Sequence, residues 1–264
     1  MSVWESLILG LIQGLTEFLP VSSSGHLEIG KVLFGSDFHK QESLLFTITL
    51  HVATALSTSV VFRKEIARLF IDLFKFKKNE ATLFTFKIVL SMIPAVAVGL
   101  FLEDFITSLF DGNILLVGTM LWITAIILFC ADRVQTTSNE LSFGKAALIG
   151  VAQAIAILPG ISRSGATIGM AVLLKVDRSQ AARFSFLMVL PLIFGSMVKS
   201  LLSIEISMGT QEELLPLFVG FLAAFATGIV ACRWMITLVR KSQLKYFAFY
   251  CMAVGGLTLL YEFF

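Results

Sequence analysis

Long runs of apolar residues separated by short polar stretches dominate the chain. Six of these runs contain few charges over about 20 residues each: 43–62, 83–102, 113–132, 181–203, 214–239 and 244–263. A helix needs about 20 mostly apolar residues to cross a bilayer, so each run predicts a transmembrane helix. The pattern predicts an all-α integral membrane protein that forms a single membrane domain over residues 1–264.

Two further apolar stretches, 3–34 and 146–174, are interrupted near their middles by Pro, Gly and Ser. The first interruption is Leu19-Pro20-Val21-Ser22-Ser23-Ser24-Gly25-His26, and the second is Leu158-Pro159-Gly160-Ile161-Ser162-Arg163-Ser164-Gly165. Backbone amides freed by such a break cannot face lipid, so the break must lie within protein or line a wet cavity. We therefore expect two re-entrant helix pairs, each entering and leaving the membrane on one side.

Charged residues between the spans predict the orientation. The 63–80 connection is rich in Lys and Arg, whereas the 103–112 and 204–213 connections contain Asp or Glu and neither Lys nor Arg. Cytoplasmic loops carry the excess of Lys and Arg, so 63–80 is predicted to lie inside and the other two outside. Counting the crossings then places both termini outside, with the first re-entrant pair on the outer face and the second on the inner face.

The two halves of the chain resemble each other at an offset of 140. Five positions of the first half recur in the second: Gly10 with Gly150, Gln13 with Gln153, Ser22 with Ser162, Ser24 with Ser164 and Gly25 with Gly165. Each half, 1–135 and 140–264, then holds one re-entrant pair and three spans. Because each repeat crosses the membrane an odd number of times, the second repeat starts on the opposite side from the first, and it is therefore predicted to be inverted. Inverted repeats with broken helices place a binding site where the breaks meet.

Composition narrows the classes of protein. The chain is 57% hydrophobic and only 14% charged, against roughly half and a quarter in soluble domains. These values exclude a soluble globular protein, a disordered chain and a nucleic-acid binder. The three cysteines, Cys130, Cys232 and Cys251, all fall in apolar runs, so we expect them to be reduced and structural.

The first break concentrates residues that can carry out chemistry. Gln13 and Glu17 share one helical face, and a carboxylate inside a membrane is a candidate for function. Glu17 could alternatively only satisfy loose backbone amides. Ser22, Ser23 and Ser24 can cap a helix whose N-terminus binds an anion, or form a plain cap. With His26, they place a nucleophile and a base beside a carboxylate.

The second break offers a similar helix start with an added cation. Ser162, Arg163 and Ser164 precede Gly165, and Thr167 follows. A guanidinium within a membrane needs an anionic partner, which is either Glu17 or a phosphate of the substrate. His51, in the span at 43–62, is expected to hydrogen-bond between helices, or to line the cavity.

Together the two breaks resemble the signatures of a known family. The segment Gln13-Gly14-Leu15-Thr16-Glu17 through Pro20 to His26 is similar to the first motif of the bacitracin-resistance type undecaprenyl-diphosphate phosphatases, and Leu158 to Thr167 is similar to their second. The stretch Phe184-Ser185-Phe186-Leu187 to Pro191 also resembles the family. Where that family has Glu or Gln, this chain has Gln13, which removes one of two carboxylates.

The resemblance implies an enzyme of the bacterial inner membrane. It would hydrolyse undecaprenyl diphosphate to undecaprenyl phosphate and phosphate, recycle the lipid carrier of cell-wall synthesis and confer bacitracin resistance. Its implied cofactor is a divalent cation, Mg²⁺ or Ca²⁺, and its partners are the prenyl diphosphate lipid and the membrane, with a homodimer left open. The active site is expected to face outside. A secondary transporter or flippase for an anionic or prenyl-phosphate substrate is the alternative.

These observations lead to a specific set of expected roles. Glu17, as base or cation ligand, Ser23, His26 and Arg163 are the expected catalytic residues, and Gln13, Ser22, Ser24, Ser162, Ser164 and Thr167 are expected to bind phosphate. Three routes stay open at this point: attack by Ser23, attack by His26, or attack by water with His26 as acid and base.

Overall fold

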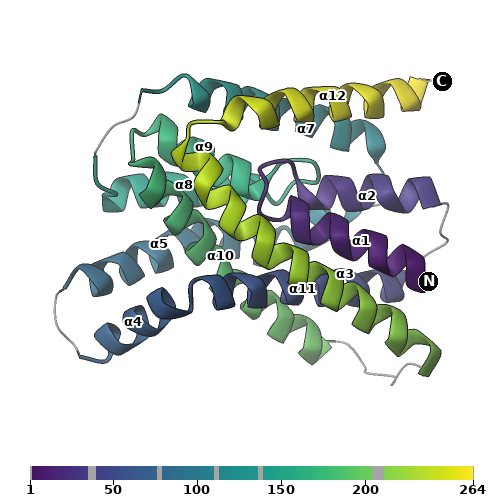
Figure 1. Ribbon diagram of the computed structural model, residues 1–264, viewed down its shortest axis with the longest axis horizontal. Coiled ribbons are helices and arrows are strands. Elements are labelled where there is room, and N and C mark those ends of the chain that lie inside the picture. The colour runs from purple at the N-terminus through teal and green to yellow at the C-terminus, as the bar shows by residue number, and fades with distance from the viewer. Residues whose placement is uncertain are drawn as a thin grey trace.

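The computed structural model is almost entirely helical over the residues that it describes, which are 2–34, 40–75, 79–109, 113–135, 139–203 and 211–263. Twelve helices form within these ranges (Figure 1). They are α1 Val3–Thr16, α2 Ser23–Phe34, α3 Lys40–Val61, α4 Arg63–Leu73, α5 Glu80–Phe101, α6 Glu103–Ser108, α7 Ile114–Asp132, α8 Phe143–Ile155, α9 Arg163–Leu173, α10 Arg178–Ser203, α11 Gln211–Arg240 and α12 Leu244–Phe263.

The long apolar helices confirm an all-α, multi-pass membrane protein. Among the described residues, α5, α7, α10, α11 and α12 are each long and apolar enough to cross a bilayer, and α3 with α4 makes a sixth candidate that bends by 79°. These helices coincide with the six predicted spans. Proline lies within α5, α10 and α11, which membrane helices tolerate because neighbouring groups satisfy the freed backbone.

Helices also occupy two segments that we expected to be connections. The basic 63–80 segment contains α4, and the acidic 103–112 segment contains α6. Residues 76–78, 110–112 and 204–210 of the three connections lie outside the described residues.

Both predicted breaks are present and divide apolar stretches into short helices. The helices α1, α2, α8 and α9 have 14, 12, 13 and 11 residues, too few to span a bilayer alone. In Figure 1, α1 runs inward from the end of the molecule that holds both termini, and α2 returns beside it. The second pair begins and ends toward the opposite end. The inverted-repeat boundaries at 1–135 and 140–264 stay a prediction.

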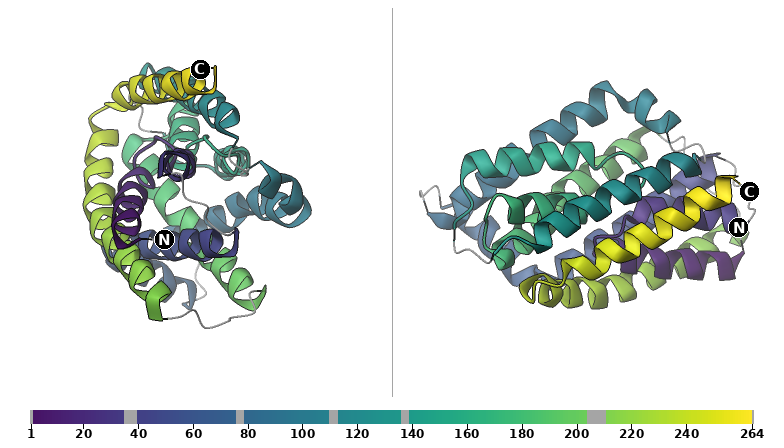
Figure 2. Two further views of the ribbon diagram at one scale, coloured as in Figure 1. Left: turned by 90° about the vertical axis from the view of Figure 1, so that its right-hand side faces the viewer. Right: turned by 90° about the horizontal axis from the view of Figure 1, so that it is seen from above.

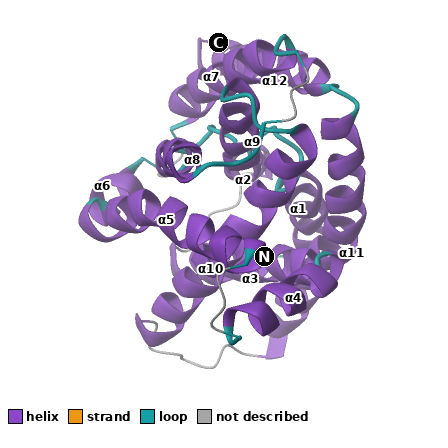
Figure 3. Cartoon of the chain, turned by 90° about the vertical axis from the view of Figure 1, so that its left-hand side faces the viewer, coloured by secondary structure: helices purple, strands orange, loops and turns teal. Residues whose placement is uncertain are grey.

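Close helix packing surrounds the breaks. A Cβ added at Gly10 of α1 would lie 2.5 Å from the Gly220 carbonyl oxygen of α11, so these backbones touch. Small residues at such contacts are how membrane helices pack without a hydrophobic driving force. Seen end-on, α2 and α9 lie in the middle with the other helices around them (Figure 3), and most helices run along the long axis (Figure 2). The two breaks are thereby enclosed in protein.

Candidate functional site

The two chain breaks pack directly against each other. Ser164 Oγ, at the second break, donates a hydrogen bond to the Leu19 carbonyl oxygen of the first at 3.1 Å. A Cβ added at Gly25 would lie 3.2 Å from Gly160 Cα, so the two backbones are in close contact. Residues about 140 positions apart therefore meet in one place, as the pattern of breaks predicted.

Each break ends in a helix that is capped in the same way. The Ser22 hydroxyl accepts from the Gly25 N–H at 3.2 Å, and the Ser162 hydroxyl accepts from the Gly165 N–H at 3.0 Å. Such a cap satisfies one of the free N–H groups of a helix start. Ser22 has φ of 70°, a left-handed conformation that turns the chain sharply into α2. Both capping side chains are buried, and their expected contacts with phosphate stay a prediction.

Glu17 is the centre of a polar cluster. Its Oε2 accepts from Gln13 Nε2 at 3.0 Å and from the Ser23 hydroxyl at 2.7 Å. Its Oε1 accepts from Arg163 Nη2 at 2.6 Å. The carboxylate side chain is only 8% exposed, and a buried charge requires such compensation by a counter-charge and donors. The cluster joins α1, α2 and α9 around one carboxylate.

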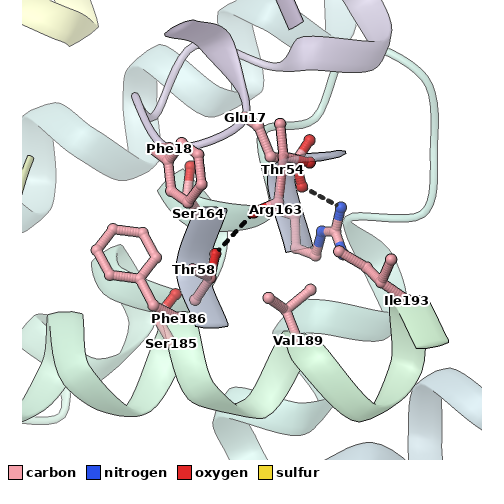
Figure 4. Close-up of a pocket in the computed structure, with 10 residues that line it drawn as sticks. All are labelled: Glu17, Phe18, Thr54, Thr58, Arg163, Ser164, Ser185, Phe186, Val189 and Ile193. Carbon is pink, nitrogen blue, oxygen red and sulfur yellow. Dashed lines mark hydrogen bonds and ion pairs between the residues drawn. The ribbon is translucent and has the colours of Figure 1, made fainter. Parts of the chain in front are cut away.

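Arg163 reaches this carboxylate from the first residue of α9. Its side chain is 27% exposed and lies beside a small cavity of about 20 Å³ (Figure 4). That volume holds about one water molecule. Polar and apolar side chains share the lining: Glu17, Phe18, Thr54, Thr58, Arg163, Ser164, Ser185, Phe186, Val189 and Ile193. The anion beside Arg163 in this structure is the Glu17 carboxylate.

His26 makes its contacts away from this carboxylate. Its Nδ1 lies 2.8 Å from the Ser22 carbonyl oxygen, and its Nε2 lies 2.8 Å from the Tyr250 hydroxyl of α12. The cavity lining does not include His26. The hydroxyl of Ser23 therefore has Glu17, and not His26, as its hydrogen-bonded base.

The remaining predicted residues link the two helix starts to their surroundings. Ser24 Oγ lies 3.3 Å from Ser22 Oγ, and Ser164 Oγ lies 3.2 Å from Ser162 Oγ. Thr167 lies one turn into α9, where its hydroxyl is 2.6 Å from Ser185 Oγ of α10. These hydroxyls support the breaks, and within the described residues only Ser164 of this set lines the cavity.

Three residues outside the expected catalytic and phosphate-binding set contact the site, and for His51 the sequence had left a place in the cavity open. His51 Nε2 of α3 lies 3.9 Å from Glu17 Oε2, and Ser185 lines the cavity. Tyr250 contacts His26 from a helix 224 residues away. The sequence feature that could have identified them is a polar residue inside an apolar span, since such residues face the bundle interior. The partner of each one depends on helix packing, which the apolar pattern does not specify.

Comparison of the sequence with known proteins identifies the family of this chain. The model of the family described as bacitracin resistance protein BacA matches residues 6–257. A protein named undecaprenyl-diphosphatase from Christiangramia forsetii is 56% identical over 263 residues, covering 100% of this chain and 99% of that protein. Proteins of the same name from Bacteroides thetaiotaomicron and Methanococcus vannielii are 48% and 39% identical, covering 98% and 97% of this chain and 98% and 99% of their own lengths. The chain therefore belongs to the bacitracin resistance protein BacA family.

Proposed function

We propose that this protein hydrolyses undecaprenyl diphosphate to undecaprenyl phosphate and inorganic phosphate. The observation that carries the proposal is the cluster at Glu17, in which one buried carboxylate contacts both the Ser23 hydroxyl and the Arg163 guanidinium. A nucleophile with its base, and a cation that can grip phosphate, are the parts that phosphoryl transfer needs. Full-length relatives named undecaprenyl-diphosphatase support the same chemistry.

Substrate binding begins with an exchange of anions. The cavity of about 20 Å³ beside Arg163 is too small for a diphosphate. In this proposal Arg163 releases Glu17 as the diphosphate enters, and grips phosphate oxygens with its planar fork. This exchange keeps the guanidinium paired throughout and frees the carboxylate to act as a base. The long apolar tail of the substrate would remain along the apolar helices.

Chemistry then follows in two balanced steps. The Ser23 oxygen attacks the terminal phosphorus while Glu17 takes the Ser23 proton, and the bond from that phosphorus to the bridging oxygen breaks. Undecaprenyl phosphate leaves. Glu17 loses its proton to the departing undecaprenyl phosphate. Water next attacks the phosphoserine phosphorus and gives one proton to Glu17, the bond from phosphorus to the Ser23 oxygen breaks, and Glu17 passes that proton to the Ser23 oxygen as inorganic phosphate leaves. Arg163 stabilises the charge that develops on the phosphoryl oxygens in both steps.

A divalent cation, Mg²⁺ or Ca²⁺, fits the oxygen atoms beside Glu17. Gln13 Oε1 is buried and has no hydrogen-bond partner among the described residues, so it is a candidate ligand together with a Glu17 oxygen. Magnesium typically takes one or two carboxylates and completes its shell with phosphate oxygens and water. No cluster of three or more His, Cys, Asp or Glu occurs in the described ranges, in keeping with a site that relies on the substrate for ligands. When bound, the cation would supply further neutralisation of phosphate charge.

The membrane and the side that the active site faces are also part of the proposed function. We place the protein in the bacterial inner membrane with the active site open to the outside, because the acidic connections and both termini are predicted to lie there. There it would recycle the carrier lipid of cell-wall synthesis and confer bacitracin resistance. A homodimer stays a prediction.

Phosphate release from a prenyl diphosphate by the purified protein in detergent tests the function. An enzyme needs no gradient, so we expect release with added Mg²⁺ or Ca²⁺, its loss on chelation, and its recovery when the cation is restored. A variant with Glu17→Gln serves as the inactive control. If no phosphate appears under any cation while reconstituted protein moves the lipid, the transporter alternative would replace the enzyme.

A further inference from the structure

A second cavity opens where α3 bends into α4, and its lining begins at Val60, on the same helix as Thr58 of the cavity beside Arg163. It has a volume of about 290 Å³ and is lined by the basic residues Arg63, Lys64 and Arg233, together with Glu65 and Val60 to Phe62. We call it the α3–α4 basic cavity. Arg63 and Lys64 begin α4, whereas Arg233 comes from α11. Basic side chains from two helices that are distant in the sequence therefore line the same cavity.

The charges of this cavity are not balanced by the protein. Glu65 is the only acidic residue of the lining, and it forms an ion pair with Arg183 of α10. In the described part of the chain, no carboxylate lies within ion-pair distance of Arg63, Lys64 or Arg233. Like charges held together repel each other. An anion between the three cations would relieve that repulsion.

The helix beside the cavity has the features of a membrane-surface helix. α4 bends by 79° from α3. It buries Leu69 and exposes Phe70, Ile71 and Phe74 by 60%, 58% and 71%. Helices with one basic polar face and exposed large apolar side chains lie in the interface of a bilayer. This position places the cavity at the depth of lipid headgroups, and basic pockets between helices on the cytoplasmic side bind anionic headgroups.

We propose that the α3–α4 basic cavity binds the phosphate headgroup of an anionic phospholipid such as phosphatidylglycerol. The guanidinium groups of Arg63 and Arg233 can each offer two parallel N–H donors to phosphate oxygens, and Lys64 adds a point charge. The acyl chains remain in the surrounding bilayer. The site is separate from the catalytic cluster and does not depend on the proposed reaction.

Native mass spectrometry of the full-length protein released from detergent micelles tests this proposal. Phosphatidylglycerol and phosphatidylcholine of equal chain length are the probes. We expect the wild type to retain phosphatidylglycerol at least about tenfold more strongly, because each basic residue adds to the attraction for an anionic headgroup. Combined Arg63→Gln, Lys64→Gln and Arg233→Gln should abolish this preference.

A matched control removes the same charge elsewhere. Arg133, Lys241 and Lys245 are exposed cations outside the cavity lining, so Gln at all three should keep the preference. Equal loss in the control and the cavity variant would overturn the proposal, since it would show a diffuse charge effect. Displacement of the lipid by inorganic phosphate at equal concentration would also overturn it in favour of a free-phosphate site.

An independent observation concerns Tyr250, and it rests on the proposed function. The Ser22 carbonyl oxygen, 2.8 Å from His26 Nδ1, can only accept, so Nδ1 carries the proton. Nε2 of the neutral ring is then unprotonated, and its lone pair accepts a hydrogen bond from the Tyr250 hydroxyl at 2.8 Å. The two rings also stack, with centroids 5.6 Å apart and planes at 10°. The imidazole is therefore held in one tautomer and one orientation.

We infer that Tyr250 is a positioning residue: by donating to Nε2 it keeps the Nδ1–H of His26 on the Ser22 carbonyl oxygen, and so fixes the turn that carries Ser23. Tyr250→Phe keeps the ring and removes only the hydroxyl. Its matched control is Tyr246→Phe, one turn earlier on α12, where the ring contacts Lys245. We expect Tyr250→Phe to lower kcat about tenfold, to change the dependence of kcat on pH and to leave KM nearly unchanged, and the control to do none of these.

A measurement that needs no turnover separates this inference from the proposed function. Diethyl pyrocarbonate modifies free imidazole nitrogen, and peptide mass spectrometry resolves His26 from the other histidines. Removing the donor should make His26 react several-fold faster in Tyr250→Phe than in the wild type or in Tyr246→Phe. Equal reactivity in all three proteins would overturn the positioning role, whereas an inactive wild type would contradict only the proposed function.

Discussion

At the scale of single residues, the site depends on how a few polar side chains share one buried carboxylate. Glu17 accepts hydrogen bonds from Gln13, Ser23 and Arg163 at once. Each donor stabilises the ionised carboxylate, and the carboxylate in turn keeps Arg163 paired in the membrane interior. The same contacts assign chemical roles, because the hydroxyl that touches a base is the one that can be activated.

Ser23 is expected to be the nucleophile. Ser23→Ala should lower kcat by at least about 10³-fold, since the covalent route disappears while Glu17 and Arg163 remain. Phosphate release by the purified variant measures this loss. Ser59→Ala is the control, because among the described residues the Ser59 hydroxyl bonds only to the Ala55 carbonyl oxygen of its own helix. A Ser23→Ala enzyme that kept a tenth of its turnover would transfer the nucleophile role to His26 or water.

Arg163 is expected to act through its shape as well as its charge. Arg163→Lys should lower kcat/KM by about 100-fold, because an ammonium lacks the fork that grips two phosphate oxygens. Thermal unfolding should change little, because the ammonium can still pair with Glu17. Arg133→Lys, at an exposed position outside the cavity, is the control. Full activity in Arg163→Lys would exclude bidentate binding and leave only the charge.

At the scale of elements, the apolar pattern was enough to predict the helices and both breaks. The spans could be predicted because a run of about 20 apolar residues in a membrane protein forms a transmembrane helix. The breaks could be predicted because Pro and Gly interrupt such runs. The helix α6 was not anticipated. The segment that contains α4 was expected to be basic and amphipathic, lying on anionic inner-leaflet lipid or forming a solvated inner loop. The start of α4 at Arg63 depends on the bend at Phe62, and no side chain caps that start.

The close approach of the second break to α7 requires glycine at position 160. This residue has φ of +92°, and a Cβ would lie 2.5 Å from the Val117 carbonyl oxygen. Gly160→Ala should therefore destabilise the protein by about 1–3 kcal/mol and lower activity by displacing Arg163. Thermal unfolding in detergent measures the change.

Gly256 of α12 provides the matched control for that substitution. A Cβ at Gly256 would meet nothing within 4 Å, so Gly256→Ala should be neutral or stabilise the helix by up to about 1 kcal/mol. Equal stability of the two variants would contradict the tight contact between Gly160 and α7.

At the scale of the whole molecule, the site could be predicted only in part. The offset of 140 residues predicts that Glu17 and Arg163 lie close together, because breaks at membrane depth must shelter each other. Tyr250 could not be assigned in this way, and for His51 the sequence left two roles open, a bond between helices or a place in the cavity lining. Each lies on a span whose rotation about its own axis is decided by packing against neighbours, and the apolar pattern of a membrane helix is nearly uniform around its circumference.

Orientation in the membrane is the whole-molecule property that decides which side the substrate comes from. The two ends of α12 test it, because Lys241 precedes this helix and Glu262 lies in its last turn, both exposed. In a background with Cys130→Ala, we expect Glu262→Cys to react with an impermeant maleimide on spheroplasts. Lys241→Cys should react only after permeabilisation, since the basic end is predicted to be cytoplasmic. The buried Cys232 and Cys251 should stay unlabelled. Labelling of Lys241→Cys alone would reverse the orientation, and the first re-entrant pair would then open to the cytoplasm.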